Sequence, residues 1–233
     1  MSYIKENLND VLKDIENACI KANRNKEDIV LIGVTKTVDI PIMEEAIKNG
    51  IKHVGENKVQ ELVKKYEIIG NKVKWHLIGT LQTNKVKYII DKVDMIHSLD
   101  RLSLCKEIDK RAKSINKVVD CLVQVNISKE ESKHGIYKED AVEFIKNISN
   151  NFKNIKIKGL MTMAPYVDNP EDARIYFREL KDLSNEIKKL NLENVYMDYL
   201  SMGMSNDFKI AIEEGSNMVR IGTSIFGKRN YMK

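Results

Sequence analysis

The sequence predicts a single (β/α)8 barrel of the TIM type, an α/β fold in which eight parallel strands alternate with helices. Short apolar runs alternate with longer amphipathic segments along the whole chain of 233 residues. The chain has only 3 prolines and no Gly/Ser-rich linker or low-complexity tract, so nothing marks a domain boundary. Open doubly wound sheets alternate in the same way but usually stop at about five or six strands. Eight units therefore favour closure, and we expect one domain over residues 1–233.

The first elements are a leading helix, a strand and a helix. Residues 3–24 have apolar side chains near helical spacing, which predicts an amphipathic helix ahead of the first strand. The continuous apolar run 29–34 predicts a strand that is buried on both faces, as in a parallel sheet. Asp39, followed by Pro41, starts a helix that ends at Gly50.

The later elements repeat this pattern. The remaining strands are expected at residues 51–54, 73–79, 95–98, 118–126, 155–160, 195–200 and 218–221. The remaining helices are expected at residues 56–69, 81–91, 100–114, 137–150, 170–190 and 206–214.

Composition and charge exclude several classes of protein. Hydrophobic residues make up 42% and charged residues 31%, which is typical of a water-soluble fold with a sizeable core. The net charge of +5 is spread along the chain, with no basic arm and no arginine cluster, so we expect no nucleic-acid partner. No apolar run is long enough to span a bilayer, and the N-terminus lacks an apolar signal segment. Three cysteines without framework spacing indicate reduced thiols in the cytoplasm, and the histidines show no metal-ligand spacing.

In this barrel the functional residues lie at the carboxyl ends of strands and in the loops that follow. That rule selects Lys36, Asn57, His76, Met163 and the segments 201–205 and 222–224.

The segments 201–205 and 222–224 have the composition of a phosphate-binding corner. Gly203 and Gly222 allow backbone N–H groups to approach an anion, and Ser201 and Thr223 add hydroxyl donors. Ordinary turn and capping roles explain either segment alone. Finding both after the last two strands, where such barrels hold phosphate, favours anion binding.

Lys36 directly follows an apolar strand and is flanked by Thr35 and Thr37. Most lysines are solvated surface groups, and at a pKa of about 10.4 only about one in a few thousand is neutral at pH 7. Partial burial or a neighbouring cation lowers the pKa and frees the amine to attack an aldehyde. Position alone leaves the surface role and the covalent role both open.

Arg220 lies two residues after Met218, so the two side chains share one face of the last strand. An arginine that faces a barrel interior needs an acceptor. A pyridine nitrogen would serve and would stay unprotonated, because arginine does not give up its proton. A carboxylate such as Asp198 or Glu56 would serve equally well.

Six short motifs occur in order along the chain. They are VTKT at 34–37, HVGEN at 53–57, WHLIGTLQTNK at 75–85, GLMTM at 159–163, LSMGMS at 200–205 and VRIGT at 219–223. Together they resemble the YggS/PROSC family of pyridoxal phosphate homeostasis proteins. The resemblance runs from about residue 5 to the end of the chain.

The resemblance implies a fold type III barrel, similar to the N-terminal domain of alanine racemase, with pyridoxal 5′-phosphate (PLP) as cofactor. It implies that Lys36 carries the cofactor as an internal aldimine and that Arg220 faces the ring nitrogen. It implies that Ser201, Gly222 and Thr223 hold the phosphate. Asn57, His76 and Met163 are implied only as neighbours in the pocket.

The same resemblance implies intracellular PLP homeostasis without catalysis. Racemases of this fold type add a β-rich domain whose tyrosine is one of two bases, whereas this chain ends ten residues after Thr223. Racemisation needs acid/base groups on both faces of the substrate carbon, and the sequence offers Lys36 on one. We therefore expect no catalytic residue, with a small PLP-dependent amino-acid racemase as the alternative. We expect a cytoplasmic monomer that binds PLP and passes it to PLP-dependent apoenzymes.

Overall fold

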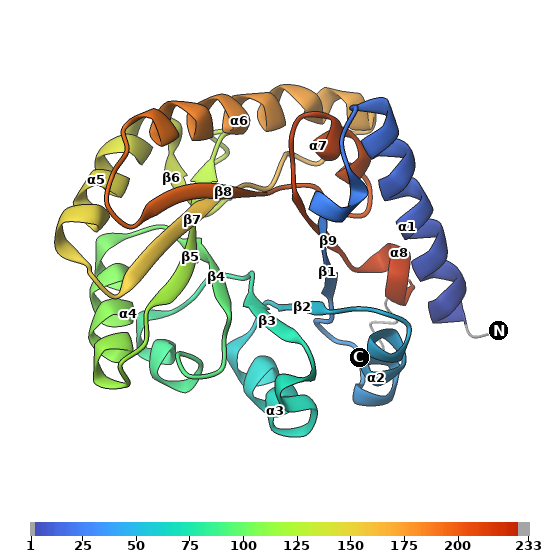
Figure 1. The fold of residues 1–233 in the computed structure, drawn as a ribbon, viewed down its shortest axis with the longest axis horizontal. Coiled ribbons are helices and arrows are strands. Elements are labelled where there is room, and N and C mark those ends of the chain that lie inside the picture. Colours follow the sequence, from blue (N-terminus) through green and yellow to red (C-terminus); the bar gives the residue numbers. More distant parts are fainter. Residues whose placement is uncertain (1–2, 228–233) are drawn as a thin grey trace.

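The structure, a computed structural model, describes residues 3–227, and these contain nine strands. The strands are β1 Val30–Val34, β2 His53–Glu56, β3 Lys74–Leu77, β4 Met95–Leu99, β5 Val119–Asn126, β6 Ile136–Tyr137, β7 Ile155–Met161, β8 Val195–Ser201 and β9 Met218–Ile221. All except β6 form a ring of parallel strands in the order β4-β3-β2-β1-β9-β8-β7-β5, and the pairing of β4 with β5 closes it (Figure 1). The predicted eight-stranded barrel is confirmed. The short β6 was not predicted, because two residues carry no periodic pattern.

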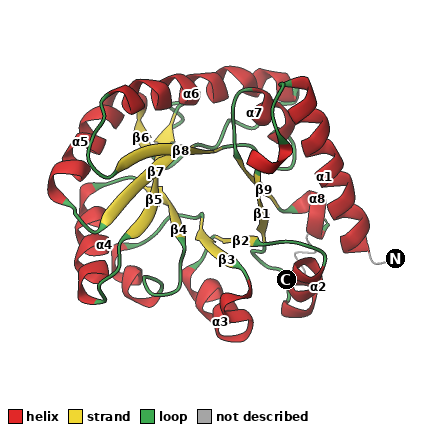
Figure 2. Ribbon diagram, in the orientation of Figure 1, coloured by secondary structure: helices red, strands yellow, loops and turns green. Residues whose placement is uncertain are grey.

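Helices surround the ring of strands (Figure 2). They are α1 Tyr3–Lys21, α2 Ile40–Lys48, α3 Val59–Ile69, α4 Leu102–Ser114, α5 Ala141–Asn151, α6 Arg174–Lys189, α7 Phe208–Glu213 and α8 Thr223–Phe226. The leading helix is confirmed as α1.

One predicted helix has a different form. Residues 81–91 were expected to be α-helical, but the segment is a 3-10 helix over Thr83–Tyr88. The N–H of Ile89 donates to the carbonyl of Val86, which is the i to i+3 pattern. Val86 and Ile89 are both fully buried, so their packing against the barrel overrides the local helical pattern.

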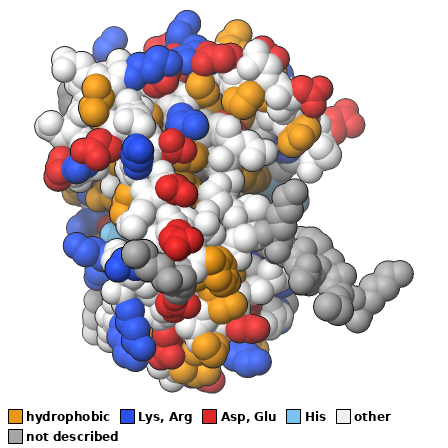
Figure 3. Space-filling view, turned by 90° about the vertical axis from the view of Figure 1, so that its right-hand side faces the viewer, with side chains coloured by type: hydrophobic (Ala, Val, Ile, Leu, Met, Phe, Trp, Pro, Cys, Tyr) orange, Lys and Arg blue, Asp and Glu red, His pale blue; other side chains and the backbone are white. Residues whose placement is uncertain are grey.

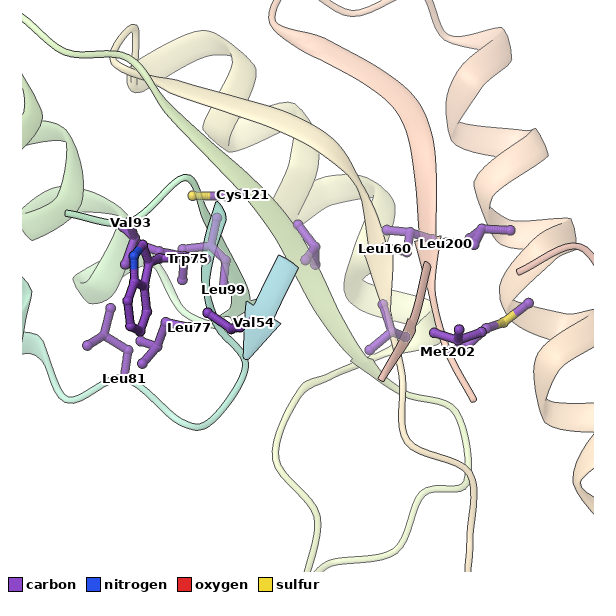
Figure 4. Close-up of a cluster of buried hydrophobic side chains, with 14 of the residues drawn as sticks. Val54, Trp75, Leu77, Leu81, Val93, Leu99, Cys121, Leu160, Leu200 and Met202 are labelled. Carbon is purple, nitrogen blue, oxygen red and sulfur yellow. The ribbon is translucent and has the colours of Figure 1, made fainter. Parts of the chain in front are cut away.

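Two apolar clusters form the core. The larger one lies between the strands and the helices, and Figure 4 shows part of it around Trp75 and Leu160. The smaller one takes side chains from the opposite face of the strands, inside the ring: Ile32, Met95, Leu122, Met161 and Met218. Because side chains alternate along a strand, Arg220 faces the same interior as Met218.

The outer surface has mixed charge. On the face seen in Figure 3, basic and acidic side chains are interspersed among apolar ones. Within residues 3–227 no helix combines the length and the apolar character needed to cross a bilayer. Cys19, Cys105 and Cys121 are all buried and free.

Candidate functional site

A pocket of about 470 Å³ opens where the strands end. This volume lies within the range of small-molecule sites. Eight of the residues that the sequence selected line it together: Lys36, Asn57, Met163, Met204, Ser205, Arg220, Gly222 and Thr223. They come from the ends of β1, β2, β7, β8 and β9, which follow one another around the barrel in the order β2-β1-β9-β8-β7.

Lys36 is half-buried in a tight turn after β1. The N–H of Val38 donates to the carbonyl of Thr35 at 2.9 Å and closes this turn. Thr37 has a φ of 62°, in the left-handed region that β-branched residues rarely adopt. The turn is therefore strained one residue after Lys36.

An ionic cluster lies on the outer side of the sheet, behind the Lys36 turn. The ammonium group of Lys65 lies 2.8 Å from Glu56 Oε1 and 2.7 Å from Glu61 Oε1. The hydroxyl of Thr35 donates to the same Glu56 oxygen at 2.6 Å. Glu56 is fully buried and Lys65 is 5% exposed, and burial raises the pKa of the Glu56 carboxyl despite Lys65. The cluster ties the end of β1 to α3.

Arg220 is 4% exposed and lines the pocket. Its Nη1 donates to Ser201 Oγ at 2.7 Å and its Nη2 to the carbonyl of Thr162 at 2.9 Å. Burial lowers the pKa of Arg220 to about 10, so the guanidinium stays cationic at neutral pH. These two bonds use two of its five N–H donors.

The carboxylate partners considered for Arg220 are wrong. Asp198 pairs with Lys158 and Glu56 pairs with Lys65. Asp207 acts on Arg220 through its charge, and its Oδ1 accepts the N–H of Met204 at 2.6 Å. A buried arginine without a hydrogen-bonded carboxylate is well suited to a neutral or anionic ligand.

Three histidines and Ser201 form a chain of hydrogen bonds behind Arg220. His53 Nδ1 lies 2.9 Å from His76 Nε2, His76 Nδ1 lies 2.9 Å from His97 Nε2, and His97 Nδ1 lies 3.0 Å from Ser201 Oγ. Burial lowers the pKa of His76 to about 3 and that of His97 well below its ordinary value, so both rings are neutral.

The donor count sets the direction of this chain. Ser201 Oγ accepts from Arg220, so the hydroxyl proton is available to His97 Nδ1. With one proton on each neutral ring, the protons of His97 and His76 lie on Nε2 and point toward His53.

Among the described residues no His, Cys, Asp and Glu side chains are grouped to hold a metal ion.

Ser201 and His76 lie behind the residues that line the pocket and do not line it themselves. Ser201 is fully buried and His76 is 3% exposed. The hydroxyl of Ser201, expected at the phosphate, is taken up by Arg220 and His97. The histidines of the chain are separated by 23 and 21 residues, close to one β/α unit each, and this recurrence is the signal that could have located them.

The segments after β8 and β9 meet, as predicted for a phosphate corner. The N–H of Ser224 donates to Ser205 Oγ at 3.3 Å, and Ser205, Gly222 and Thr223 line the pocket. Gly203 has a φ of 94°, and a Cβ there would lie 2.6 Å from the Cβ of Ala211. Only glycine fits this close approach.

Other lining residues were missed by sequence reasoning. Lys133, Tyr166 and Asp207 line the pocket from the loops after β5, β7 and β8. All three lie in loops that follow strands, but nothing in the local sequence distinguishes them from other loop residues.

The family model described as alanine racemase, N-terminal domain, matches residues 18–230 of this chain. A pyridoxal phosphate homeostasis protein of Aquifex aeolicus is 48% identical over 227 residues, which cover 97% of this chain and 98% of the relative. One of Haemophilus influenzae is 38% identical over 231 residues, covering 98% of this chain and 97% of the relative.

Solved structures agree with these matches. PipY of Synechococcus elongatus PCC7942, with PLP bound, has a TM-score of 0.80 at 28% identity and covers 92% of this chain and 100% of its own. An alanine racemase of Clostridium difficile 630 has a TM-score of 0.77 at 17% identity, covering 100% of this chain and 58% of the racemase. At that identity the racemase shows the fold alone.

Proposed function

This chain belongs to the family of the pyridoxal phosphate homeostasis proteins, and from that membership we propose that it binds PLP in the pocket at Lys36 and acts in PLP homeostasis. The observation that carries the proposal is the pocket itself. Lys36, the buried cation Arg220 and the Gly222–Thr223 segment line one cavity of about 470 Å³. An amine, a fixed N–H donor and a segment suited to an anion match the aldehyde, the ring nitrogen and the phosphate of PLP.

The residues present fit the cofactor. Lys36 would hold the cofactor through its amine, which is a nucleophile suited to an aldehyde. Arg220 would face the ring nitrogen and, having no proton to give up, would leave that nitrogen unprotonated. PLP supplies an electron sink for amino-acid chemistry, and this arrangement weakens it.

The first test concerns Lys36. Lys36→Ala should abolish the yellow absorbance that PLP gives when it is covalently attached to the protein. Lys58→Ala, at an exposed position next to Asn57, is the matched control and should leave the absorbance unchanged. If Lys36→Ala kept the chromophore, or if borohydride still fixed the cofactor covalently to this variant, another residue would carry the cofactor.

The second test concerns the phosphate. Hydrogen bonds to a charged acceptor contribute roughly 1.5–3 kcal/mol each. Two or three such bonds near Ser205, Gly222 and Thr223 should make PLP bind at least about a hundredfold more tightly than pyridoxal. Titration of both ligands measures this difference, and equal affinities would remove the phosphate corner from the proposal.

We propose that binding, without turnover, is the function. The alternative is a small PLP-dependent amino-acid racemase, because the barrel has the racemase fold. Incubation with L-amino acids in heavy water separates the two. We expect no deuterium at the α-carbon, and steady exchange over many turnovers would establish the enzyme.

The remaining expectations are also proposals. We infer that the protein is cytoplasmic, since its three cysteines are buried and free, as is usual in a reducing compartment. We also propose that it is a monomer. PLP-dependent apoenzymes are the proposed recipients of the cofactor. Cofactor transfer to an apoenzyme, followed by the enzyme's recovered activity, tests that step.

A further inference from the structure

We propose that Glu61 and Lys65 are positioning residues for Lys36, acting from the outer side of the barrel. They hold the Thr35–Val38 turn in a strained conformation that presents Lys36 to the pocket. The inference rests on the proposed function, because it assigns the residues that prepare Lys36 to react.

The turn needs to be held because of Thr37. Its φ of 62° places a β-branched residue where glycine or asparagine is usual, at the third position of a turn. The hydroxyl of Thr37 donates to the Lys36 carbonyl at 2.6 Å, which is a local bond. A more relaxed φ for Thr37 would reorient the peptide that follows Lys36.

Helix α3 holds the turn on both sides of Lys36. The N–H of Thr37 donates to Glu61 Oε1 at 2.6 Å. The ammonium group of Lys65 donates to the carbonyl of Thr35 at 2.5 Å. Glu61 and Lys65 lie one helical turn apart and pair with each other. One face of α3 therefore hydrogen-bonds both the residue before Lys36 and the residue after it.

Buried Glu56 fixes the position of Lys65. It accepts from Lys65 at 2.8 Å and from the hydroxyl of Thr35 at 2.6 Å. Lys65 thus has three oxygen partners, from β2, α3 and the Lys36 turn. A cluster that served only to attach α3 to the sheet would not need bonds to the backbone of Thr35 and Thr37.

The experiment compares two phosphate esters. PLP can react with Lys36, whereas pyridoxine 5′-phosphate lacks the aldehyde and reports only on the pocket. The variants are Glu61→Ala, Thr37→Gly and the two combined. Glu67→Ala, at an exposed position of the same helix, is the matched control. Absorbance gives the rate of covalent attachment, and calorimetry gives the affinity for pyridoxine 5′-phosphate.

Glu61→Ala removes a charged acceptor, so we expect attachment of PLP to slow about tenfold. Affinity for pyridoxine 5′-phosphate should stay within about twofold, and Glu67→Ala should change neither quantity. Exchange of the Thr37 amide hydrogen, measured without any ligand, should become faster in Glu61→Ala. Glycine adopts positive φ without strain, so Thr37→Gly should restore most of the lost rate in the double variant.

Several results would overturn the inference. They are an unchanged attachment rate or Thr37 exchange in Glu61→Ala, an equal loss of affinity for both esters, or a rate loss that Thr37→Gly does not reduce. A parent protein that takes up neither ester would overturn the proposed function and this inference together. A parent that binds both esters while Glu61→Ala behaves like it would overturn this inference alone.

Discussion

Arg220 and Lys36 lie on the walls of one pocket, but the polar networks behind them differ in charge and in the side of the sheet that they occupy. Inside the ring, Arg220 donates to the neutral Ser201, and the neutral rings of His97 and His76 continue the chain. Outside the ring, Lys65 lies between the carboxylates of Glu56 and Glu61.

The difference shows two ways to bury a charge. The inner network gives its cation only neutral hydrogen-bond partners, which suits a group that must act on a ligand. The outer network pairs its cation directly with two carboxylates, which suits a group that must stay fixed. Breaking a buried pair leaves an uncompensated charge, whereas breaking a neutral bond leaves an unsatisfied dipole. Substitutions in the two networks should therefore lower the free energy of unfolding by different amounts.

The largest effect is expected in the outer network. Lys65→Met leaves the buried Glu56 without its ion pair and should lower the free energy of unfolding by about 3–5 kcal/mol. Lys64→Met, its exposed neighbour in α3, should stay within about 0.5 kcal/mol. Adding Glu56→Gln to Lys65→Met should recover part of the loss. Urea titration measures all of these, and similar losses for Lys64→Met and Lys65→Met would contradict the comparison.

Ser201→Ala tests the inner network. It removes one of the two acceptors of Arg220 and should lower the free energy of unfolding by about 1–3 kcal/mol. Ser103→Ala, on the exposed face of α4, should lower it little. Binding sharpens the result. If Ser201 acts through Arg220, pyridoxal and PLP should weaken by similar factors. A direct phosphate contact, as predicted from the sequence, would spare pyridoxal.

Lowering the pH should change the free energy of unfolding in opposite directions through the two networks. Burial lowers the pKa of His76 to about 3 from an ordinary value of about 6.5, so in this range the unfolded chain binds a proton that the folded chain does not. The contribution of His76 to the free energy of unfolding is fully present above about pH 6.5. It falls by about 1.4 kcal/mol for each pH unit below that value. The raised pKa of Glu56 has the opposite effect, because protonation then favours the folded state.

Two substitutions check these signs. His76→Gln should flatten the decline of the free energy of unfolding between pH 6 and pH 4, by about 1.4 kcal/mol per unit. Glu56→Gln should make the decline steeper. Parallel curves for both variants and the parent, in urea titrations at each pH, would show that neither group titrates as its burial implies.

The smallest effect is expected at Thr37. Left-handed backbone costs a residue other than glycine about 1–2 kcal/mol, and glycine costs roughly 0.5–1 kcal/mol in lost entropy. Thr37→Gly should therefore stabilise the fold by about 0.5–1 kcal/mol. Thr80→Gly, in an exposed loop without positive φ, should destabilise it by a similar amount. A loss at both positions would show that Thr37 is not strained.

The ends of the predicted strands located the site. The continuous run 29–34 and the alternation at Met218 and Arg220 located the barrel and the inward-facing arginine. The prediction placed Ser201 on the phosphate and His76 on the pocket wall, and neither side chain lines the pocket. Both lie on the correct face of their strands, but one layer too deep.

The sequence by itself determined the alternation of strands and helices, the side of the last strand that faces inward, and the segments at the strand ends. Those features depend on neighbouring residues, because burial and side-chain period act locally along the chain. Only the tertiary structure decided that His53, His76 and His97 touch, that Glu61 and Lys65 grip the Lys36 turn, and that Ser201 serves Arg220. These contacts join separate strands and helices. Which residues meet depends on the register of neighbouring strands in the closed barrel.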